Sequence, residues 1–338
     1  MHQVTSSLAL PILDADLEAR LRARMDEVEE ALLGHVESEA PFVTKAARHL
    51  MEAGGKRFRP LLCFLAAQTG QSPDTPGDQA NVRTAACVVE LTHLASLYHD
   101  DVMDEAALRR GAESANARWD NHVAILTGDF LFAKSSELTA ALGPDAVRIQ
   151  AQTFSRLVEG QILETLGPGA EDDPLEHYLR VVAGKTGSLI ATSARYGAMF
   201  GGASEEVVEA LTEYGERVGV AFQLSDDILD VASESVESGK TPGTDLREGV
   251  PTLPVLFALR STDPADARLR ELLSGELTDD ALHAEALGLL RAHPAMAEAR
   301  EYVVGEAAAA KELLAALPEG AVRTSLEDFA DVVADRSS

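Results

Sequence analysis

The sequence predicts an all-α protein, and three observations lead to this prediction. Nearly every periodic segment of the 338-residue chain repeats its apolar residues at helical spacing. The chain shows neither alternating strand pairs joined by hairpin turns nor an internal repeat of solenoid length. Apolar residues make up 46% of the chain, which is enough for a sizeable core. We therefore expect one helical domain over residues 1–338.

The first helices are predicted from two kinds of pattern. Residues 16–36 alternate charged and apolar residues with the period of an amphipathic helix. Residues 58–69 form a shorter apolar run that also predicts a helix. Residues 78–101 are mostly apolar, with small residues repeated throughout. A helix that is apolar most of the way round is expected to be buried at the centre of the protein.

Later helices are separated by turn-rich segments. Beyond residue 260 we expect three or four helices, of which residues 306–317 are the clearest because of their alanine content. The breaks are short and rich in glycine or charged residues, which is typical of loops at a functional site. The breaks lie at 70–78, 166–174 and 239–254. Helices are predicted between the first and last of these breaks over 117–141, 145–166, 174–200 and 204–231.

The composition argues against two classes of partner. With 29 Lys and Arg against 56 Asp and Glu, the formal net charge is −27, which disfavours nucleic acid and anionic membrane surfaces. Cys63 and Cys87 lie in apolar runs without CxxC spacing, as reduced core residues do. No apolar run approaches the roughly 20 residues of a membrane span, and the N-terminus lacks the basic start of a signal peptide. We expect a cytoplasmic protein with no transmembrane segment.

Three carboxylates follow the apolar helix predicted over 78–101. Asp100 and Asp104 are four residues apart, so a helix places them on one face, roughly 6 Å apart along its axis. Asp101 lies about 100° further round the helix. A solvated acidic face is the usual explanation for such a cluster. Carboxylates that emerge from a buried helix instead favour a cation site.

The same pattern recurs in FQLSDDILDV, where Asp226, Asp227 and Asp230 again follow an apolar helical run. One D-D-x-x-D pattern is a weak signal, whereas two copies in the same context are hard to assign to chance. Hard oxygen ligands without histidine or thiolate select Mg²⁺ over zinc. Magnesium in proteins often binds through one or two carboxylates together with phosphate oxygens.

Basic residues gather in short turns beside glycines. Arginine forks and lysine point charges both suit phosphate. Each one alone is more often a surface charge, but together with two predicted Mg²⁺ motifs they indicate a pocket for more than one polyphosphate. These residues are Lys56, Arg57 and Arg59, then Arg109 and Arg110, then Lys185 beside Thr186, and Lys240.

At these motifs the chain resembles the trans-polyprenyl (isoprenyl) diphosphate synthase family. The resemblance covers about residues 41–259, through GGKRFRP, ELTHLASLYHDDVMDEAALRRG, GDFLFAKS, KTGSL, FQLSDDILD and GKTPGTDLREGVPTLP. It implies an isoprenoid-synthase helical bundle around a central cavity, in a homodimer. It also implies head-to-tail condensation of isopentenyl diphosphate with an allylic diphosphate, using about three Mg²⁺ ions per active site.

The resemblance assigns roles to the residues that match its motifs. Asp100 and Asp104 would hold two Mg²⁺ ions. Asp226, supported by Asp230, would hold a third, while Asp101 and Asp227 would be outer partners. The allylic diphosphate would be bound by Arg109, Lys185 and Lys240, and isopentenyl diphosphate by Lys56, Arg59, His93 and Arg110. The dipoles of Thr186, Gln223 and the Lys185 carbonyl would face the allylic cation. The released diphosphate can take the proton, so no dedicated protein base is needed.

Two further features concern affinity and product length. Many family members carry lysine where this chain has Val250, so the allylic diphosphate site has one fewer potential cation. Ala95 and Ser96 are small, where short-chain synthases usually carry an aromatic residue. This predicts a medium-to-long product, roughly hexaprenyl to octaprenyl. Geranylgeranyl diphosphate is the alternative, and Tyr98 would shorten the product if it turned inward.

Three rival functions remain to be weighed. A class I terpene cyclase shares the fold, but usually carries an Asn/Ser/Glu-type second metal motif and lacks Lys56 and Arg59. A regulatory subunit of a heteromeric synthase typically loses an aspartate motif, and this chain keeps both. A helical scaffold with acidic faces is the third alternative, and it gives no reason for the basic residues in glycine turns.

Overall fold

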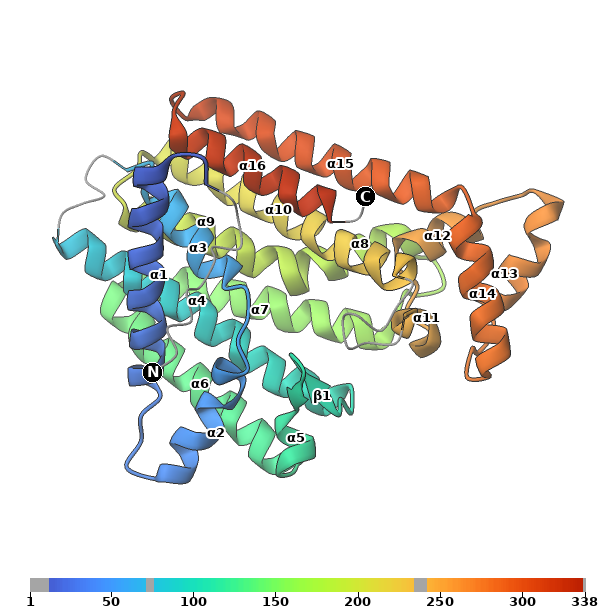
Figure 1. The fold of residues 1–338 in the computed structure, drawn as a ribbon, viewed down its shortest axis with the longest axis horizontal. Helices are drawn as coiled ribbons and strands as arrows, with labels where there is room; N and C mark the ends of the chain where they lie inside the picture. Colours follow the sequence, from blue (N-terminus) through green and yellow to red (C-terminus); the bar gives the residue numbers. More distant parts are fainter. Residues whose placement is uncertain (1–11, 71–75, 234–241, 337–338) are drawn as a thin grey trace. The chain divides into compact units, whose positions relative to one another are not determined.

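Helices form most of the described part of the chain, residues 12–70, 76–233 and 242–336, in this computed structural model (Figure 1). The strands within those residues are one antiparallel pair of two residues each, β1 (Leu108–Arg109) and β2 (Ala112–Glu113). The predicted all-α fold is confirmed, and the small hairpin is an addition to it. It forms because Arg110 and Gly111 adopt positive φ angles, 54° and 76°, at the turn between the strands.

The chain forms two compact units, each built from several stretches of sequence. We describe each unit by itself, and the expected single domain stays a prediction. Unit 1 comprises Met1–Phe154, Leu189–Gly215 and Leu314–Asp328, and unit 2 comprises Ser155–Ser188, Glu216–Leu313 and Phe329–Ser338.

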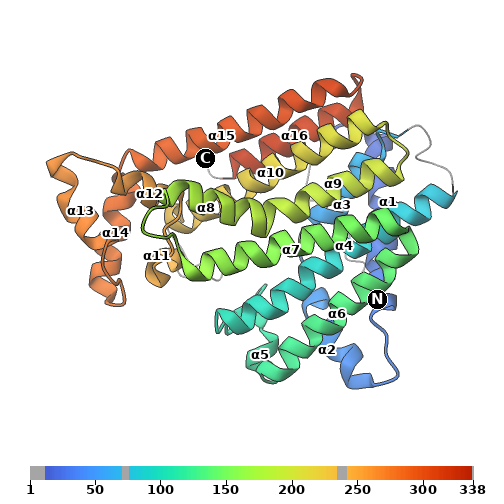
Figure 2. The ribbon, with the colours of Figure 1, turned by 180° about the vertical axis from the view of Figure 1, so that it is seen from behind.

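Unit 1 is organised around its long helix α4. Helix α4 packs most extensively on α6, and the two run side by side (Figure 2). Val88, Leu91 and Leu94 of α4 are completely buried, which confirms the predicted central position of this helix. The helices of this unit are α1 (Ala15–His35), α2 (Pro41–Glu52), α3 (Phe58–Ala67), α4 (Pro76–Met103), α5 (Ala115–Arg118), α6 (Asn121–Leu142), the first half of α7 (Pro144–Leu166), nearly all of α9 (Ser188–Phe200), the start of α10 (Glu205–Ala232), η4 (Leu314–Ala316) and the first half of α16 (Ala321–Asp335).

Unit 2 carries the second aspartate motif on α10. Arg217 of α10 pairs with Glu306 of α15 at 3.3 Å. Aspartate caps start several helices, as when Asp173 accepts the N–H groups of Leu175 and Glu176 at the start of α8. Besides parts of α7, α10 and α16, the unit contains α8 (Pro174–Val182), η1 (Ala183–Gly187), α11 (Thr244–Glu248), α12 (Leu253–Leu259), η3 (Pro264–Asp266), α13 (Ala267–Leu273), α14 (Asp280–Ala292) and α15 (Ala295–Leu313).

The helix predicted over 174–200 is interrupted by η1, a π-helical turn. Its AGKTG sequence includes two glycines, which lower the cost of leaving α-helical geometry. Gly160 of α7 packs directly against this turn, because a Cβ at that position would lie 2.7 Å from the Lys185 nitrogen. Single π turns inside α-helices often occur at functional sites.

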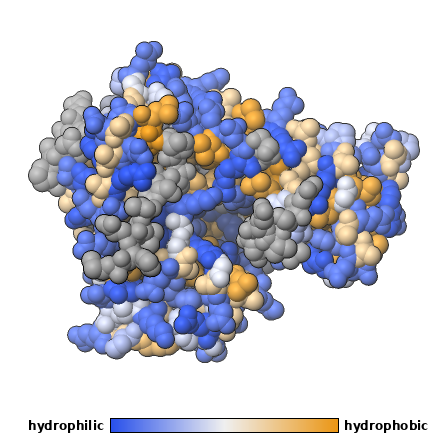
Figure 3. Space-filling view, viewed as in Figure 1, coloured by the Kyte–Doolittle hydropathy of each residue, from blue (hydrophilic) through white to orange (hydrophobic). Residues whose placement is uncertain are grey.

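The surface and the cysteines match the predicted character of the chain. The face drawn in Figure 3 is largely hydrophilic, with scattered hydrophobic patches. No helix within the described ranges is both long and apolar enough to span a membrane. Cys63 and Cys87 are both buried and free, as predicted.

Candidate functional site

The first aspartate motif closes helix α4 in unit 1. The Asp104 N–H donates to the Asp100 carbonyl at 2.8 Å, so the helical path continues through the motif and both residues share one face. Asp104 is exposed, Asp100 is half-buried and Asp101 is completely buried. The motif therefore presents two accessible carboxylates beside one that belongs to the protein interior.

Asp101 anchors Arg109 from the hairpin that follows α4. Arg109 Nε donates to Asp101 Oδ1 at 2.6 Å. Burial raises the pKa of Asp101, and the Arg109 guanidinium opposes that shift. Asp101 Oδ2 is buried and has no hydrogen-bond partner among the described residues. The aspartate motif and the arginines that follow it are thus joined directly by the Asp101–Arg109 ion pair.

A group of arginines surrounds His93. Burial and the neighbouring charges of Arg59, Arg110, Arg57 and Arg109 lower the pKa of His93 well below its usual value. Burial also lowers the pKa of Arg59 to about 10, with help from Arg110 and against Glu90. Like charges gathered out of water are costly, so an anion would relieve this cluster.

Three of the four residues predicted for isopentenyl diphosphate belong to this group. Arg59, His93 and Arg110 lie together, and the buried Arg59 Nε has no hydrogen-bond partner within the described ranges. The fourth, Lys56, is exposed and its ammonium lies 5.8 Å from the centre of the Phe58 ring. The arrangement offers arginine donors to a polyphosphate with no metal ion between them.

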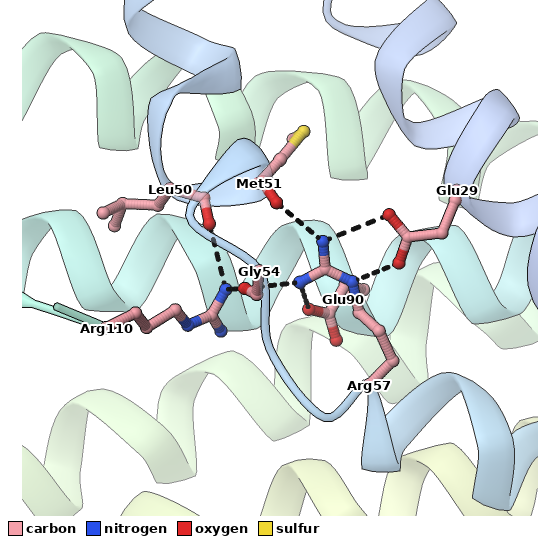
Figure 4. A network of polar contacts seen from close by, with 7 residues as sticks. All are labelled: Glu29, Leu50, Met51, Gly54, Arg57, Glu90 and Arg110. Carbon is pink, nitrogen blue, oxygen red and sulfur yellow. Dashed lines mark hydrogen bonds and ion pairs between the residues drawn. The ribbon is translucent and has the colours of Figure 1, made fainter. Parts of the chain in front are cut away.

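Arg57, which the sequence grouped with the cations of a polyphosphate pocket, instead forms an ion-pair network with Glu29 and Glu90 beside this cluster (Figure 4). Sequence reasoning assigned no role to the two glutamates. Glu90 is 2% exposed and pairs with Arg57 at 3.0 Å. The signal in the sequence was a single carboxylate inside the apolar run CVVELTHL, since a buried carboxylate requires a cationic partner.

Two of the three residues predicted to set product length contact neighbouring helices of unit 1. Ala95 is completely buried, and its carbonyl lies 3.1 Å from where a Cβ on Gly128 of α6 would stand. The Tyr98 hydroxyl donates to the Ala46 carbonyl of α2 at 2.5 Å. Ser96 Oγ donates to the carbonyl of His93 at 2.8 Å. Tyr98 is therefore fixed onto α2 by its hydroxyl.

The second aspartate motif lies on α10 in unit 2, and its outer members contact other segments of that unit. Asp226 pairs with Arg336 at 2.8 Å, and Arg336 also stacks 4.6 Å from the centre of the Phe222 ring. Asp230 accepts the backbone N–H groups of Thr244 and Asp245 at 3.2 and 3.1 Å, at the start of α11.

The middle carboxylate, Asp227, begins a chain of buried hydrogen bonds. Tyr178 donates its hydroxyl to Asp227, and Gln223 Nε2 donates to Asp227 at 2.8 Å. The Thr186 hydroxyl in turn donates to Gln223 Oε1 at 2.9 Å. Burial raises the pKa of Asp227 to about 6, against these hydrogen bonds. The chain links Thr186 to Gln223 and adds Tyr178, which sequence reasoning missed.

Three further cationic positions bear on the predicted allylic diphosphate site. Lys185, in the π-helical turn, pairs with Glu164 of α7 at 2.6 Å. Lys240 lies outside the described residues. Arg247, near the position where Val250 replaces the usual lysine, pairs with Asp280 at 2.9 Å.

The carboxylates fit Mg²⁺ as part of its ligand shell. In residues 12–70, 76–233 and 242–336, no three His, Cys, Asp or Glu side chains form a ready metal cluster. Two hard carboxylates on one helical face, such as Asp100 and Asp104, nevertheless suit an ion that takes its other ligands from water and phosphate. The orphaned Oδ2 of Asp101 is a further acceptor beside them.

Comparison with known proteins shows the family. The family model Polyprenyl synthetase matches residues 40–290. The chain is 52% identical over 323 residues to the nonaprenyl diphosphate synthase of Mycobacterium tuberculosis, covering 96% of this chain and 95% of that protein. It is 40% identical to heptaprenyl diphosphate synthase component 2 of Geobacillus stearothermophilus, covering 91% and 94%.

A solved structure agrees in both sequence and fold. Geranylgeranyl pyrophosphate synthase from Corynebacterium glutamicum, complexed with calcium and isoprenyl diphosphate, superposes with a TM-score of 0.86 at 46% identity, covering 97% of this chain and 99% of that one. The chain therefore belongs to the polyprenyl synthetase family of prenyltransferases, with their all-α isoprenoid-synthase fold.

Proposed function

We propose that this protein condenses isopentenyl diphosphate head to tail with an allylic diphosphate, in an Mg²⁺-dependent reaction that yields a medium-to-long polyprenyl diphosphate. The observation that carries this proposal is the cationic group of Arg59, His93 and Arg110. It offers arginine donors to a polyphosphate without a metal ion. A terpene cyclase, which takes one diphosphate substrate, has no use for such a site.

The reaction transfers the allyl group from oxygen to carbon. The allylic C–O bond breaks and its electron pair leaves with the diphosphate. The double bond of isopentenyl diphosphate supplies the electrons of the new C–C bond, and a proton passes to the released diphosphate. Mg²⁺, held by Asp100, Asp104, Asp226 and Asp230, would neutralise the charge of the leaving group.

The chain's own residues orient and protect the reacting groups. Arg109 and Lys185 would bind the allylic diphosphate, with Asp101 fixing Arg109 through the 2.6 Å hydrogen bond. Thr186 and Gln223 would present neutral dipoles to the allylic cation, because a stronger nucleophile would capture it. Their hydrogen bond to one another holds both dipoles in place.

Product length follows from the small residues before the first motif. With Ala95 and Ser96 small and the Tyr98 hydroxyl bonded to α2, we propose a product of roughly hexaprenyl to octaprenyl length. The 52% identity to a nonaprenyl synthase supports a long product. The 46% identity to a geranylgeranyl synthase favours the second candidate, geranylgeranyl diphosphate.

The test is chromatography of products made from labelled isopentenyl diphosphate and an allylic primer, with Mg²⁺ and with excess chelator. We expect long polyprenyl products that require the metal. The variant Ala95→Phe should shorten the product while turnover continues, because a bulky side chain at this position would obstruct the tunnel that the family resemblance predicts. A farnesyl-only product from the wild type would contradict the long-chain proposal, and diphosphate release without isopentenyl diphosphate would indicate a cyclase.

We also propose a cytoplasmic homodimer. The free, buried thiols of Cys63 and Cys87 accord with a reducing compartment. Ile125 and Leu126 expose 41% and 66% of their surface next to one another on α6. Adjacent exposed apolar side chains on a helix suit contact with a second copy of the chain.

A further inference from the structure

A network of ion pairs centred on Arg57 joins four helices of unit 1 (Figure 4). Arg57, at the start of α3, donates from Nε and Nη2 to Glu29 of α1 at 2.5 and 3.2 Å. Its Nη1 donates to Glu90 of α4 at 3.0 Å, and its Nη2 to the carbonyl of Met51 in α2 at 3.1 Å. One guanidinium therefore contacts α1, α2 and α4 from the start of α3.

Arg57 holds an uncommon backbone conformation. Its φ angle is 51°, in the left-handed region that residues with a Cβ rarely adopt. The side chain is 5% exposed and reaches two carboxylates and a carbonyl from this conformation. The contacts of the side chain thus maintain the shape of the loop.

The loop in turn holds Arg110 through the carbonyl of Gly54. Arg57 Nη1 and Arg110 Nη1 both donate to this oxygen, and Arg110 Nη1 also donates to the Leu50 carbonyl at 3.0 Å. Gly55 allows the close approach, because a Cβ there would lie 2.9 Å from the guanidinium. Among the described residues, no hydrogen bond uses Arg110 Nε or Nη2, which leaves two donor nitrogens for an anion.

Glu90 acts electrostatically on three arginines but is bonded to one. It raises the pKa of Arg57, and it opposes the lowering that burial causes in the pKa values of Arg59 and Arg110. Its hydrogen bond goes to Arg57. Without Arg57, the buried Glu90 carboxylate would have to find another cation, and Arg59 and Arg110 are the candidates beside it.

We propose that Arg57 is a positioning residue for the isopentenyl diphosphate site: it engages Glu90 and fixes the Gly54 carbonyl, so that Arg59 and Arg110 remain available to a diphosphate. The proposal rests on the function proposed above. It makes this site depend on Glu29 of α1, a helix that supplies none of the predicted ligands.

Steady-state kinetics with each substrate varied separately tests this. For Glu29→Gln we expect KM for isopentenyl diphosphate to rise about fivefold, with kcat and KM for the allylic substrate changed less than about twofold. The matched control is Glu27→Gln. Glu27 lies on the same helix, also pairs with an arginine and has the same exposed side-chain fraction, 43%. It should leave all constants unchanged.

Two variants test whether Arg57 keeps Glu90 from pairing with Arg59 or Arg110: the single variant Arg57→Met and the double variant Arg57→Met/Glu90→Gln. Arg57→Met should raise KM for isopentenyl diphosphate about tenfold or more, because Glu90 then pairs with Arg59 or Arg110. Removing the Glu90 charge as well should recover part of that loss, as a role limited to stabilising the fold would not. If Arg57→Met fails to fold, Glu29→Gln and its control still decide the outcome.

Equal KM increases for both substrates, or a double variant worse than Arg57→Met, would overturn the proposal. Calorimetric titration of metal-free protein with isopentenyl diphosphate measures binding without turnover. It therefore tests the positioning role of Arg57 separately from the proposed function. A wild type that binds but does not condense the substrates would contradict the function, and the dissociation constants of the variants would then test the positioning role. A wild type that neither binds nor reacts would overturn both.

Discussion

His93 lies within a group of arginines, and this environment shifts its acid–base chemistry. Burial and the charges of Arg59 and Arg110 lower its pKa. A neutral ring offers one donor and one acceptor, whereas a protonated ring would add to the local positive charge. A bound diphosphate would offset the arginine charges and ease protonation of the ring. The protonation of His93 can therefore change when a diphosphate binds and leaves.

The lowered pKa predicts a pH-dependent stability. As pH falls below about 6.5, the unfolded chain takes up the proton before the folded chain does, so the free energy of unfolding decreases by up to about 1.4 kcal/mol per pH unit. His93→Gln removes this contribution. We expect the variant to lose less stability than the wild type between pH 6.5 and 5.5 in urea titrations. Equal losses would show that the imidazole is not held neutral.

At the scale of elements, the π-helical turn η1 places the Lys185 nitrogen and the Thr186 hydroxyl. The turn packs on α7 at Gly160, where a Cβ would lie 2.7 Å from the Lys185 nitrogen and 3.1 Å from the Gly184 carbonyl carbon. Backbone atoms cannot rotate aside as a flexible side chain can. A side chain at position 160 must therefore shift η1 relative to this part of α7.

Gly160→Ala tests the importance of this contact. We expect kcat to fall about a hundredfold, because a shift on the order of 1 Å misplaces the dipoles of Thr186 and Gln223. KM for isopentenyl diphosphate should stay within about twofold. Gly288→Ala is the control, since that helical glycine has no atom within 4 Å of its Cβ position. It should be neutral or slightly stabilising. Similar kinetics for both variants would show that Gly160 packing does not position the turn.

At the scale of the whole molecule, the proposed homodimer depends on the exposed apolar pair on α6. Leu126→Glu places a charge where a second copy would exclude water, so the dimer dissociation constant should rise at least about tenfold. Light scattering coupled to size-exclusion chromatography measures the change. Val304→Glu on α15, at a site 57% exposed, is the control and should leave the dimer intact. A dimer unaffected by Leu126→Glu would place the interface elsewhere.

Most of the fold could be predicted because helical periodicity is local information. The buried position of α4 followed from its apolar residues, and the shared face of Asp100 and Asp104 from their spacing. The hairpin after Asp104 and the π turn at Lys185 could not be predicted. Each depends on positive φ angles or on a close approach by another helix, which no local pattern specifies.

The sequence alone predicted a prenyltransferase, because the motifs that carry the family resemblance are contiguous strings of residues. Only the tertiary structure decided which basic residues form ion pairs with carboxylates of the protein. Arg57 and Arg59 stand two residues apart in one motif, yet Arg57 is paired with Glu29 and Glu90, while Arg59 has a buried nitrogen with no partner in the described chain. The physical reason is that an ion pair depends on distance in space, and Glu29 and Glu90 reach Arg57 only after α1, α3 and α4 have packed.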